Sequence, residues 1–444
     1  MKAGREDMNE LDPRAVIARE PMHYRQVIAI AVATALNALD GFDVLSISFA
    51  APGISKEWGI DRAALGLVLS MELIGMGIGA LVLGAMADRV GRRPTILGCL
   101  VIMASGMFLA STAQTLPILS AYRLFTGLGI GGMLAATNAI VAECANARRR
   151  NLSVAIMAGG YPMGAIVGGS IAAVLLGTTG RWQSVFEFGA LMTALFIPLV
   201  LWLVPETIAF LLHKRPAGAL EKINRTMVRQ GRAPLTALPP RDEQPRRFSI
   251  GQFFAPGIAG VTTLLILAYF AHMMTFYFLV KWIPKIVVDM GFPPASAGGV
   301  LVWANVGGAS GSIVLSLLTQ KFGVRPLVIG AMTCGAVAVT VFGQGFTTLA
   351  SLSIIACIGG FFTNAATAGL YAVIAQSFPA SLRAGGTGLV IGIGRAGAAS
   401  GPIVAGLMFA GGSSLQFVAL VMGCGTLVGA IALGLVRYRE NTIA

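Results

Sequence analysis

Charged residues are scarce in this sequence. Only 11% of its 444 residues are Asp, Glu, Lys or Arg, whereas 56% are hydrophobic and the mean hydropathy is +0.78. Soluble domains average about 25% charged residues, so this scarcity excludes an ordinary soluble protein. The long apolar runs, together with 57 glycines, are typical of a helical protein that crosses a membrane several times.

Metal and redox motifs are also missing. The five cysteines lie apart, in or beside apolar runs, and form no CxxC or Cys/His cluster. We interpret them as small packing residues rather than disulfides or metal ligands. No nucleophile stands beside a base, so we expect no enzyme, no metal and no other cofactor. The first 24 residues hold five acids and no apolar core, so we expect no cleavable signal peptide.

Twelve apolar runs are long enough to cross a membrane, and they divide six and six. We therefore predict an all-α membrane protein with 12 transmembrane helices in two six-helix, pseudo-symmetric bundles. The predicted spans are 27–51, 63–87, 94–112, 116–143, 151–176, 184–205, 255–282, 296–319, 326–345, 348–376, 383–410 and 414–436. The expected domains are an N-terminal segment (1–24), a first bundle (25–205), a linker with one amphipathic helix near 217–230 (206–252), a second bundle (253–436) and a C-terminal tail (437–444).

Lys and Arg are distributed unevenly about the predicted spans. Of the 32, 25 fall on one side of the membrane, four on the other and three within spans. By the positive-inside rule this asymmetry puts both termini in the cytoplasm. A net charge of +13 can also indicate nucleic-acid binding. Because the membrane topology accounts for it here, we expect a lipid bilayer and no nucleic acid as partner.

Two carboxylates, Asp40 and Asp43, interrupt the first predicted span. On a helix they lie one turn apart on neighbouring faces. An ionised carboxylate costs at least about 2.5–3.5 kcal/mol at mid-bilayer, so such residues face the bundle interior and usually mark a proton or substrate route. The alternative is two acids permanently paired with bases for packing. We favour proton transfer, because two acids this close repel each other and titrate as a coupled pair.

The two halves of the sequence repeat at an offset of 232–233 residues. Residues 84–94 match 316–326, and the same offset carries Asp40 onto His272. Parallel repeats of this kind predict a substrate site between the halves near the membrane midplane. The acid pair exists in the first half only.

Three motifs resemble those of a known family. Gly84-x-x-x-Asp88-Arg89-x-Gly91-Arg92-Arg93, after the second span, resembles the signature of the major facilitator superfamily, and this resemblance covers the whole chain. Arg123-x-x-x-Gly127-x-Gly129-x-Gly131-Gly132 resembles a second motif of that family. Pro205-Glu206-Thr207 resembles the motif of its sugar and organic-anion branches. One departure is Gln320, which replaces the acid in the second copy of the loop motif.

A narrower resemblance is to the bacterial aromatic acid:H+ symporters. It rests on Asp40-Gly-Phe-Asp43, Trp282-Ile-Pro284 and Gly394-Arg395. It implies a major facilitator fold in a bacterial inner membrane, and symport of a small aromatic acid with H+ for aromatic hydrocarbon catabolism. The fifth span lacks the Gly-Pro pair of antiporters, which disfavours an exporter.

The loop motif predicts a conformational latch. Asp88 can point at the N-terminus of the eleventh span near Ser381, where the helix dipole favours an anion by about 0.3–1 kcal/mol. Arg92 can reach Glu143 at the end of the fourth span. We expect Asp88, Arg89, Arg92 and Glu143 to hold the halves together on the cytoplasmic side. The alternative for Glu143 is an exposed carboxylate at a helix end.

Arg123 is a fixed cation within the fourth span, so it needs an anion in a dry bundle. We expect Asp40 or Asp43 to be that anion and assign proton coupling to these three residues. Glycines four and eight residues after Arg123 leave room for another helix backbone. Glu72 is a further buried acid without an evident partner, and it can equally serve only to tie helices together.

Arg395 lies within the eleventh span, and the predicted spans seven to twelve contain no acid to pair with it. An anionic ligand, or an acid from the first half, explains this cation best. Aromatic and polar residues of spans seven, eight and ten complete the predicted substrate site, although an aromatic stripe can also face lipid or core. They are Tyr269, His272, Phe276, Trp303, Asn305, Asn364 and Tyr371.

We therefore predict a monomeric, proton-coupled importer of a benzoate- or hydroxybenzoate-type acid, driven by the proton gradient without a cofactor. A drug:H+ antiporter or exporter is one alternative, but Arg123, Lys281 and Arg395 are unfavourable neighbours for a cationic drug. A membrane sensor without transport is another, and it would have no need of the acid pair.

Overall fold

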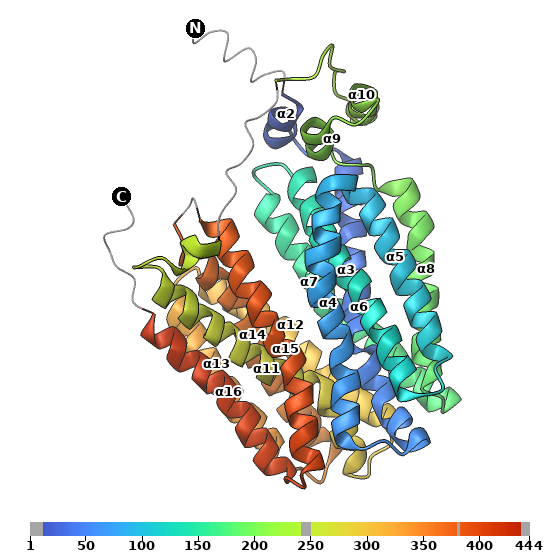
Figure 1. Ribbon diagram of the computed structural model, residues 1–444, viewed down its shortest axis with the longest axis vertical. Coiled ribbons are helices and arrows are strands. Elements are labelled where there is room, and N and C mark those ends of the chain that lie inside the picture. Colours follow the sequence, from blue (N-terminus) through green and yellow to red (C-terminus); the bar gives the residue numbers. More distant parts are fainter. Residues whose placement is uncertain (1–11, 241–249, 380–381, 437–444) are drawn as a thin grey trace.

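A computed structural model describes residues 12–240, 250–379 and 382–436, and Figure 1 shows its helices. Twelve of the described helices are long and apolar enough to cross a membrane, which confirms the predicted fold class. They are α3 (Tyr24–Trp58), α4 (Arg62–Val90), α5 (Arg92–Ser111), α6 (Leu116–Cys144), α7 (Arg150–Thr179), α8 (Gln183–Leu203), α11 (Ala259–Asp289), α12 (Pro294–Leu318), α13 (Val324–Phe342), α14 (Leu349–Gln376), α15 (Arg383–Ala410) and α16 (Leu415–Leu435). The shorter elements are α2 (Pro13–Arg19), α9 (Ile208–Lys214), α10 (Ala219–Arg229) and the 3-10 helix η1 (Ile250–Phe254).

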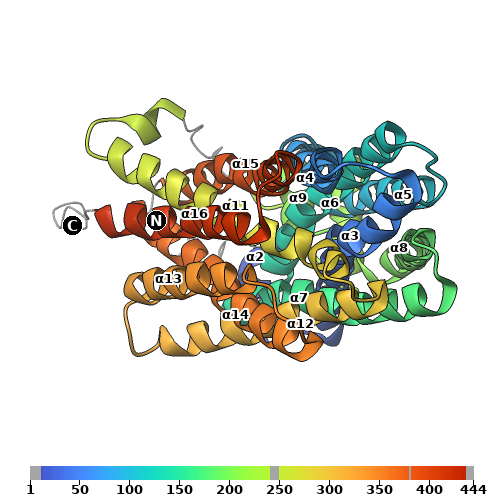
Figure 2. The same ribbon diagram turned by 90° about the horizontal axis from the view of Figure 1, so that it is seen from below.

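The long helices form two bundles, α3 to α8 and α11 to α16 (Figures 1 and 2). We call the end of the molecule that carries α2, α9 and α10 the linker face, and the other end the opposite face. In Figure 1 the bundles lie close together at the opposite face and spread apart toward the linker face. The helices that join them most extensively are α4 with α15 and α7 with α12.

The two bundles touch at the opposite-face ends of these helices. A Cβ on Gly66 of α4 would lie 2.5 Å from the carbonyl oxygen of Pro402 on α15, so the two backbones are in direct contact. Arg62, at the start of α4, donates to the Asp289 carboxylate at the end of α11 over 3.0 Å. These contacts close the opposite face.

Local sequence signals explain where α3 begins and ends. His23 caps its N-terminus in a reciprocal capping box with Gln26, which satisfies main-chain donors of the first turn. The helix ends at Gly59, whose φ of 59° belongs to the left-handed region that glycine adopts readily. Within these bounds α3 runs for 35 residues and carries Asp40 and Asp43 in its middle.

The sequence repeat extends to individual contacts. A side-chain nitrogen of Arg93, near the start of α5, donates to the carbonyl of Leu201 near the end of α8. Arg325 near the start of α13 donates to the carbonyl of Leu433 near the end of α16. Both pairs are related by the same offset of 232 residues, so equivalent arginines fasten equivalent helix ends in the two bundles.

The linker face carries a small hydrophobic core of its own. Its members come from α2, α9 and α10, and they are Ile17, Ile208, Phe210, Leu211, Leu212, Ile223 and Met227. Helix α10 lies where the amphipathic helix was predicted, whereas α2 and α9 were not expected. Arg232 anchors this layer to the first bundle by donating to Glu20 at 2.8 Å and to Gln26 at 3.3 Å. The predicted C-terminal tail, 437–444, lies outside the described residues.

Candidate substrate and proton site

A fully buried ion pair joins α4 and α6. A guanidinium nitrogen of Arg123 lies 2.5 Å from Glu72 Oε2, and both side chains are 0% exposed. The same nitrogen donates to the main-chain carbonyl of Asp43 at 2.9 Å, and the guanidinium carbon lies 5.2 Å from the Phe186 ring centroid. We had expected the carboxylate of Asp40 or Asp43 to be the partner of Arg123. That prediction was wrong, because Arg123 pairs with Glu72.

Glycines bring α4 and α6 close enough for this pair to form. A Cβ on Gly127 would lie 2.2 Å from the carbonyl oxygen of Glu72, and a Cβ on Gly75 would lie 2.2 Å from that of Leu124. No other side chain fits between the two backbones. The space that the sequence predicted beside Arg123 is thus occupied by the helix that carries its counter-ion.

Lys281 of α11 reaches the same carboxylate from the other bundle. Its ammonium lies 3.4 Å from Glu72 Oε2 and donates to the main-chain carbonyl of Val44 on α3. The side chain is 0% exposed. Burying an ammonium is costly unless it is paired, so Glu72 and the carbonyl group account for its position.

The carboxylates of Asp40 and Asp43 are buried and poorly satisfied. Neither oxygen of Asp40 has a hydrogen-bond partner among the described residues, and its side chain is almost fully enclosed. Asp43 accepts one long hydrogen bond, 3.5 Å from Thr193 Oγ1 on α8. A buried carboxylate without a cation or donors is stabilised by taking up a proton. The proton-transfer role predicted for the pair stays a prediction, and these surroundings are compatible with it.

Arg395 interacts with four phenol groups. It is partly buried in the middle of α15, and its guanidinium interacts electrostatically with Tyr371, Tyr269, Tyr277 and Tyr161. Tyr161 belongs to α7 of the first bundle, and the other three belong to α11 and α14 of the second. Within the described part of the chain, Arg395 has no ion pair. The arrangement offers a cation near four phenol groups, with no acid paired to it among the described residues.

Gly394 allows one of these rings to approach. A Cβ at this position would lie 2.3 Å from the Tyr269 ring, so only glycine lets Tyr269 pack against α15 beside Arg395. The Tyr269 hydroxyl lies 3.1 Å from that of Tyr371. The Gly394-Arg395 pair thus combines space for an aromatic ring with a fixed positive charge.

Three predicted polar site residues use their hydrogen bonds within the second bundle. His272 Nδ1 lies 2.7 Å from Thr426 Oγ1, and Nε2 lies 3.0 Å from both the Thr363 carbonyl and Thr367 Oγ1. Asn305 and Asn364 donate to carbonyls of their own helices. None of these contacts brings the three residues to Arg395.

The two remaining aromatic candidates occupy different surroundings. Phe276 is buried and packs edge-on against Tyr277, with ring centroids 5.1 Å apart. Phe276 therefore supports one of the rings around Arg395. Trp303 of α12 is 54% exposed, which is typical of a side chain that faces lipid or an open path.

The predicted latch is half formed. Arg92 bonds to Glu143 on α6 at 3.0 Å and to Asp88 at 3.1 Å. The Asp88 side chain is 72% exposed, and Arg89 is exposed as well. Ser381, near which we expected Asp88 to dock, lies outside the described residues. Asp88 therefore pairs within its own motif in this arrangement, in which the bundles meet at the opposite face.

Glu206 of the Pro-Glu-Thr motif is hydrogen-bonded to the end of the loop motif. Its carboxylate accepts hydrogen bonds from the main-chain N–H groups of Arg92 at 3.0 Å and Arg93 at 3.3 Å, which begin α5, and from that of Thr207 at 2.9 Å. An acid at a helix N-terminus is favoured by the helix dipole. Burial raises the pKa of Glu206, although the three N–H groups and nearby Arg92 oppose the shift.

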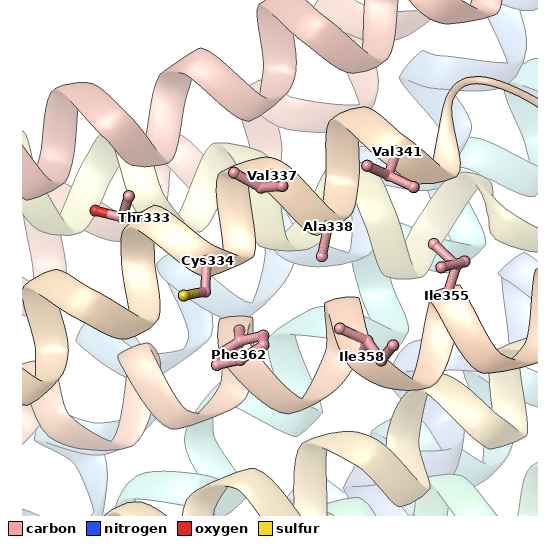
Figure 3. Close-up of a pocket in the computed structure, with 8 residues that line it drawn as sticks. All are labelled: Thr333, Cys334, Val337, Ala338, Val341, Ile355, Ile358 and Phe362. Carbon is pink, nitrogen blue, oxygen red and sulfur yellow. The ribbon is translucent and has the colours of Figure 1, made fainter.

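An apolar depression of about 340 Å³ lies elsewhere, between α13 and α14. Figure 3 shows the eight side chains that line it, from Thr333 to Phe362. None of them is a cation or an acid, so this depression lacks the partner that a carboxylate ligand requires.

Sequence reasoning missed the role of Glu72, Lys281, Tyr161 and Tyr277. A signal for the first of these was present. Gly75 and Gly79 form a small-residue stripe one turn after Glu72, and Gly127 and Gly131 form one after Arg123. Two such stripes favour contact between their helices, which would have placed the acid beside the base.

Comparisons with known proteins agree with this architecture. The family model described as Major Facilitator Superfamily matches residues 32–316 and 265–443. The chain is similar in fold to a crystal structure of the D-xylose-proton symporter, with a TM-score of 0.69, 18% identity and coverage of 92% of this chain and 97% of that one. A structure of the xylose transporter XylE from E. coli in an inward open conformation is similar as well. Its TM-score is 0.69 at 18% identity, with coverage of 93% of this chain and 97% of that one.

Curated relatives are similar over nearly the whole chain. The 3-(3-hydroxy-phenyl)propionate transporter of Escherichia coli (strain K12) is 29% identical, with coverage of 94% of this chain and 96% of the relative. The gallate transporter of Pseudomonas putida is 29% identical, with coverage of 95% and 94%. The 4-hydroxybenzoate transporter PcaK of Pseudomonas putida is 29% identical, with coverage of 97% and 98%. The chain therefore belongs to the Major Facilitator Superfamily of multi-pass membrane transporters.

Proposed function

We propose that this protein imports a small aromatic carboxylate together with H+ by alternating access. The observation that carries the proposal is Arg395, a partly buried cation among phenol groups that has no ion pair with any described residue. A guanidinium matches a carboxylate in two-pronged geometry, and the rings provide an apolar, stackable surface for an aromatic substrate.

Both bundles contribute to the proposed substrate site. Tyr161 lies in the first bundle, whereas Tyr269, Tyr277 and Tyr371 lie in the second with Arg395. A site built from both halves near the middle of the helices is the arrangement expected for transporters with parallel repeats. A ligand held there can be exposed to either face as one bundle rocks against the other.

The proposed proton carriers are Asp40 and Asp43 in the first bundle. Their carboxylates are buried, close together and nearly without donors, which suits groups that exist in both protonated and ionised forms. Arg123 bonds to the main chain at Asp43, so it can sense a change in that turn of α3. Binding of an anion at Arg395 and of a proton at the acids would be mutually favourable.

The names of the relatives support an aromatic acid as substrate. Three of them transport 3-(3-hydroxy-phenyl)propionate, gallate and 4-hydroxybenzoate, which share an aromatic ring and a carboxylate. We further propose a monomer in a bacterial inner membrane, with the linker face and both termini in the cytoplasm, because Lys and Arg concentrate there. In that orientation the structure is closed to the outside. The latch residues act in the outward-open state, in which they hold the bundles together on the cytoplasmic side, and they are Asp88, Arg89, Arg92 and Glu143.

The proposal is tested by transport into proteoliposomes that contain the purified protein. Labelled benzoate, 4-hydroxybenzoate, gallate and 3-(3-hydroxyphenyl)propionate are offered with and without an inwardly directed proton gradient. We expect at least one acid to accumulate and the gradient to raise that accumulation several-fold. A cationic dye offered in parallel tests exchange against H+. Export of the dye, with no uptake of any acid, would replace this proposal by a drug:H+ antiporter.

A further inference from the structure

Lys281 is a cation of the second bundle whose bonds go to the first. Its helix, α11, packs chiefly against α15 and α16. Its ammonium nevertheless bonds to Glu72 of α4 and to the main-chain carbonyl of Val44 on α3. When the two bundles separate at the opposite face, α11 moves with the second bundle, so Lys281 must leave both partners.

The carboxylates in the region of Lys281 outnumber the cations there. Of the carboxylates Asp40, Asp43 and Glu72, only Glu72 is ion-paired among the described residues, with Arg123 of the first bundle and Lys281 of the second. In the closed arrangement Glu72 Oε2 is shared by both cations, at 2.5 Å and 3.4 Å. The negative charge on Glu72 opposes ionisation of its neighbours, and Lys281 offsets that charge.

The other titratable groups around this cluster are phenols, the thiol of Cys99 on α5, which interacts electrostatically with Asp40, and Arg395. Tyr161 on α7 and Tyr277 on α11 interact electrostatically with Glu72, and Tyr277 also with Arg395 on α15. Helices α12 and α16, which also pack on α11, contain no Asp, Glu, Lys or Arg. Lys281 is thus the group of the second bundle that delivers positive charge to the carboxylates directly.

We infer that Lys281 is a mobile counter-cation that couples closure of the opposite face to proton release. This inference rests on the proposed function. With the opposite face open, Lys281 is withdrawn and the carboxylate cluster takes up a proton. Closure inserts Lys281 beside Glu72. The O–H bond of the protonated carboxyl, which we place on Asp40, then breaks, its electron pair stays on the carboxylate, and water on the linker-face side accepts the proton.

Charge counting links this step to the substrate. Three carboxylates against two cations leave one excess negative charge, and Arg395 cancels it in the empty closed protein. A monoanionic substrate at Arg395 restores the excess, and one proton removes it. The site is therefore neutral both in the empty protein and in the protein loaded with one acid and one proton. Neither form buries an unbalanced charge in the low-dielectric interior while the bundles rock.

Lys281→Gln and the double variant Glu72→Gln/Lys281→Gln test the coupling. The single variant adds one excess negative charge, whereas the double variant has the same net charge as the wild type. The probe is whichever of the four acids named above the wild-type protein carries fastest. Exchange of labelled for unlabelled acid measures movement without net proton transfer, and gradient-driven accumulation measures coupled transport. Lys321→Gln, an exposed lysine of the same bundle, is the matched control.

We expect Lys281→Gln to keep exchange within about threefold of wild type but to lose about tenfold or more of gradient-driven accumulation, equivalent to about one pH unit of coupling. The double variant should regain accumulation to within about threefold, and Lys321→Gln should behave as wild type. Undiminished accumulation by Lys281→Gln would overturn the inference. A double variant that retains exchange, and is therefore folded although Arg123 has lost its carboxylate partner, but accumulates no better than the single variant would also overturn it, since Lys281 would then serve only the structure.

A distance measurement tests the same role without any substrate. Spin labels at Lys56→Cys and Gln416→Cys, in a variant with the five native cysteines replaced, report opening of the opposite face. Lowering the pH from about 8 to about 5 should lengthen the distance in otherwise wild-type protein, because a proton taken up by the carboxylate cluster weakens its attraction for Lys281. With Lys281→Gln the distance should already be long at pH 8. Distributions that are short and unaffected by either change would overturn the inference, even if the protein carries none of the acids.

Discussion

The carboxylate of Glu72 and the guanidinium of Arg123 form an ion pair 2.5 Å long with no solvent exposure on either side chain. Each charge is costly to bury, and each is tolerated because the other is there. Removing Arg123 leaves the Glu72 carboxylate with Lys281 alone, 3.4 Å away, and removing Glu72 leaves two buried cations without their carboxylate. The pair fixes α4 against α6 on the side of the first bundle that faces Lys281.

We expect Arg123→Gln to destabilise the protein by about 3–5 kcal/mol, the usual cost of breaking a buried pair. Arg181→Gln is the control, because its pair with Glu187 is 61% and 47% exposed and should contribute at most about 1 kcal/mol. Thermal unfolding in detergent, followed by tryptophan fluorescence, compares the two variants. Equal unfolding temperatures would mean that Arg123 is solvated and that its pair with Glu72 contributes little.

A second prediction concerns the two acids of α3. Asp40→Asn and Asp43→Asn should each abolish accumulation driven by the proton gradient, because an amide cannot carry the proton, while exchange of labelled substrate continues. Glu221→Gln on α10, an exposed acid outside the bundles, serves as control and should have no effect. Uptake into proteoliposomes with an imposed pH gradient measures both activities. Normal accumulation by both Asn variants would remove these acids from proton coupling.

A third prediction concerns the latch. Asp88→Asn and Arg92→Ala should slow the maximal rate of uptake with little change in substrate affinity. Both residues lie at the linker face, far from Arg395 along the helices, and Arg92 bridges Asp88 and Glu143. Initial rates over a range of substrate concentrations, together with binding to purified protein, separate the two quantities. Binding weakened more than about tenfold at an unchanged maximal rate would place the loop nearer the substrate.

A fourth prediction concerns the carboxylate at the start of α5. Glu206→Ala removes the acceptor for the N–H groups of Arg92 and Arg93, so it should cost about 0.5–2 kcal/mol, as loss of a helix cap does. Glu206→Gln keeps one acceptor oxygen and should cost less. Thermal unfolding ranks the three proteins. Identical stability of the Ala and Gln variants would show that capping is not what Glu206 contributes.

The number of membrane spans could be predicted from the sequence, because apolar runs of sufficient length have no other stable structure. Their ends were predicted less well. The seventh predicted span stops at 282, whereas α11 continues to Asp289. Hydropathy falls at Lys281 and Lys285, but the helix continues because Lys281 is buried against Glu72 and a carbonyl group, and Lys285 pairs with Asp289. Charges that the protein itself neutralises do not end a helix.

The candidate site was predictable in its residue types and only partly in its pairings. Arg395, Tyr269 and Tyr371 were predicted together and lie together. His272 was predicted beside them, yet its ring nitrogens bond to threonines of α14 and α16. The sequence shows that a polar side chain lies within a span, but not which neighbouring helix faces it. Tyr161 was missed for the same reason, since its part in the site depends on how the first bundle meets the second.

The last prediction separates an importer of carboxylates from an exchanger of cations. Arg395 has no ion pair within the described residues, and its guanidinium matches a carboxylate in a geometry that an ammonium cannot reproduce. Arg395→Lys should therefore keep the charge but lose much of the affinity. Arg395→Ala should lose about 1.5–3 kcal/mol, which is about 10- to 150-fold in Kd. The neutral amide of the same acid should bind wild type poorly and the Ala variant no worse. Calorimetry with acid and amide on the three proteins measures this, and equal binding of the acid to wild type and the Ala variant would exclude Arg395 from the substrate site and favour the cation exchanger.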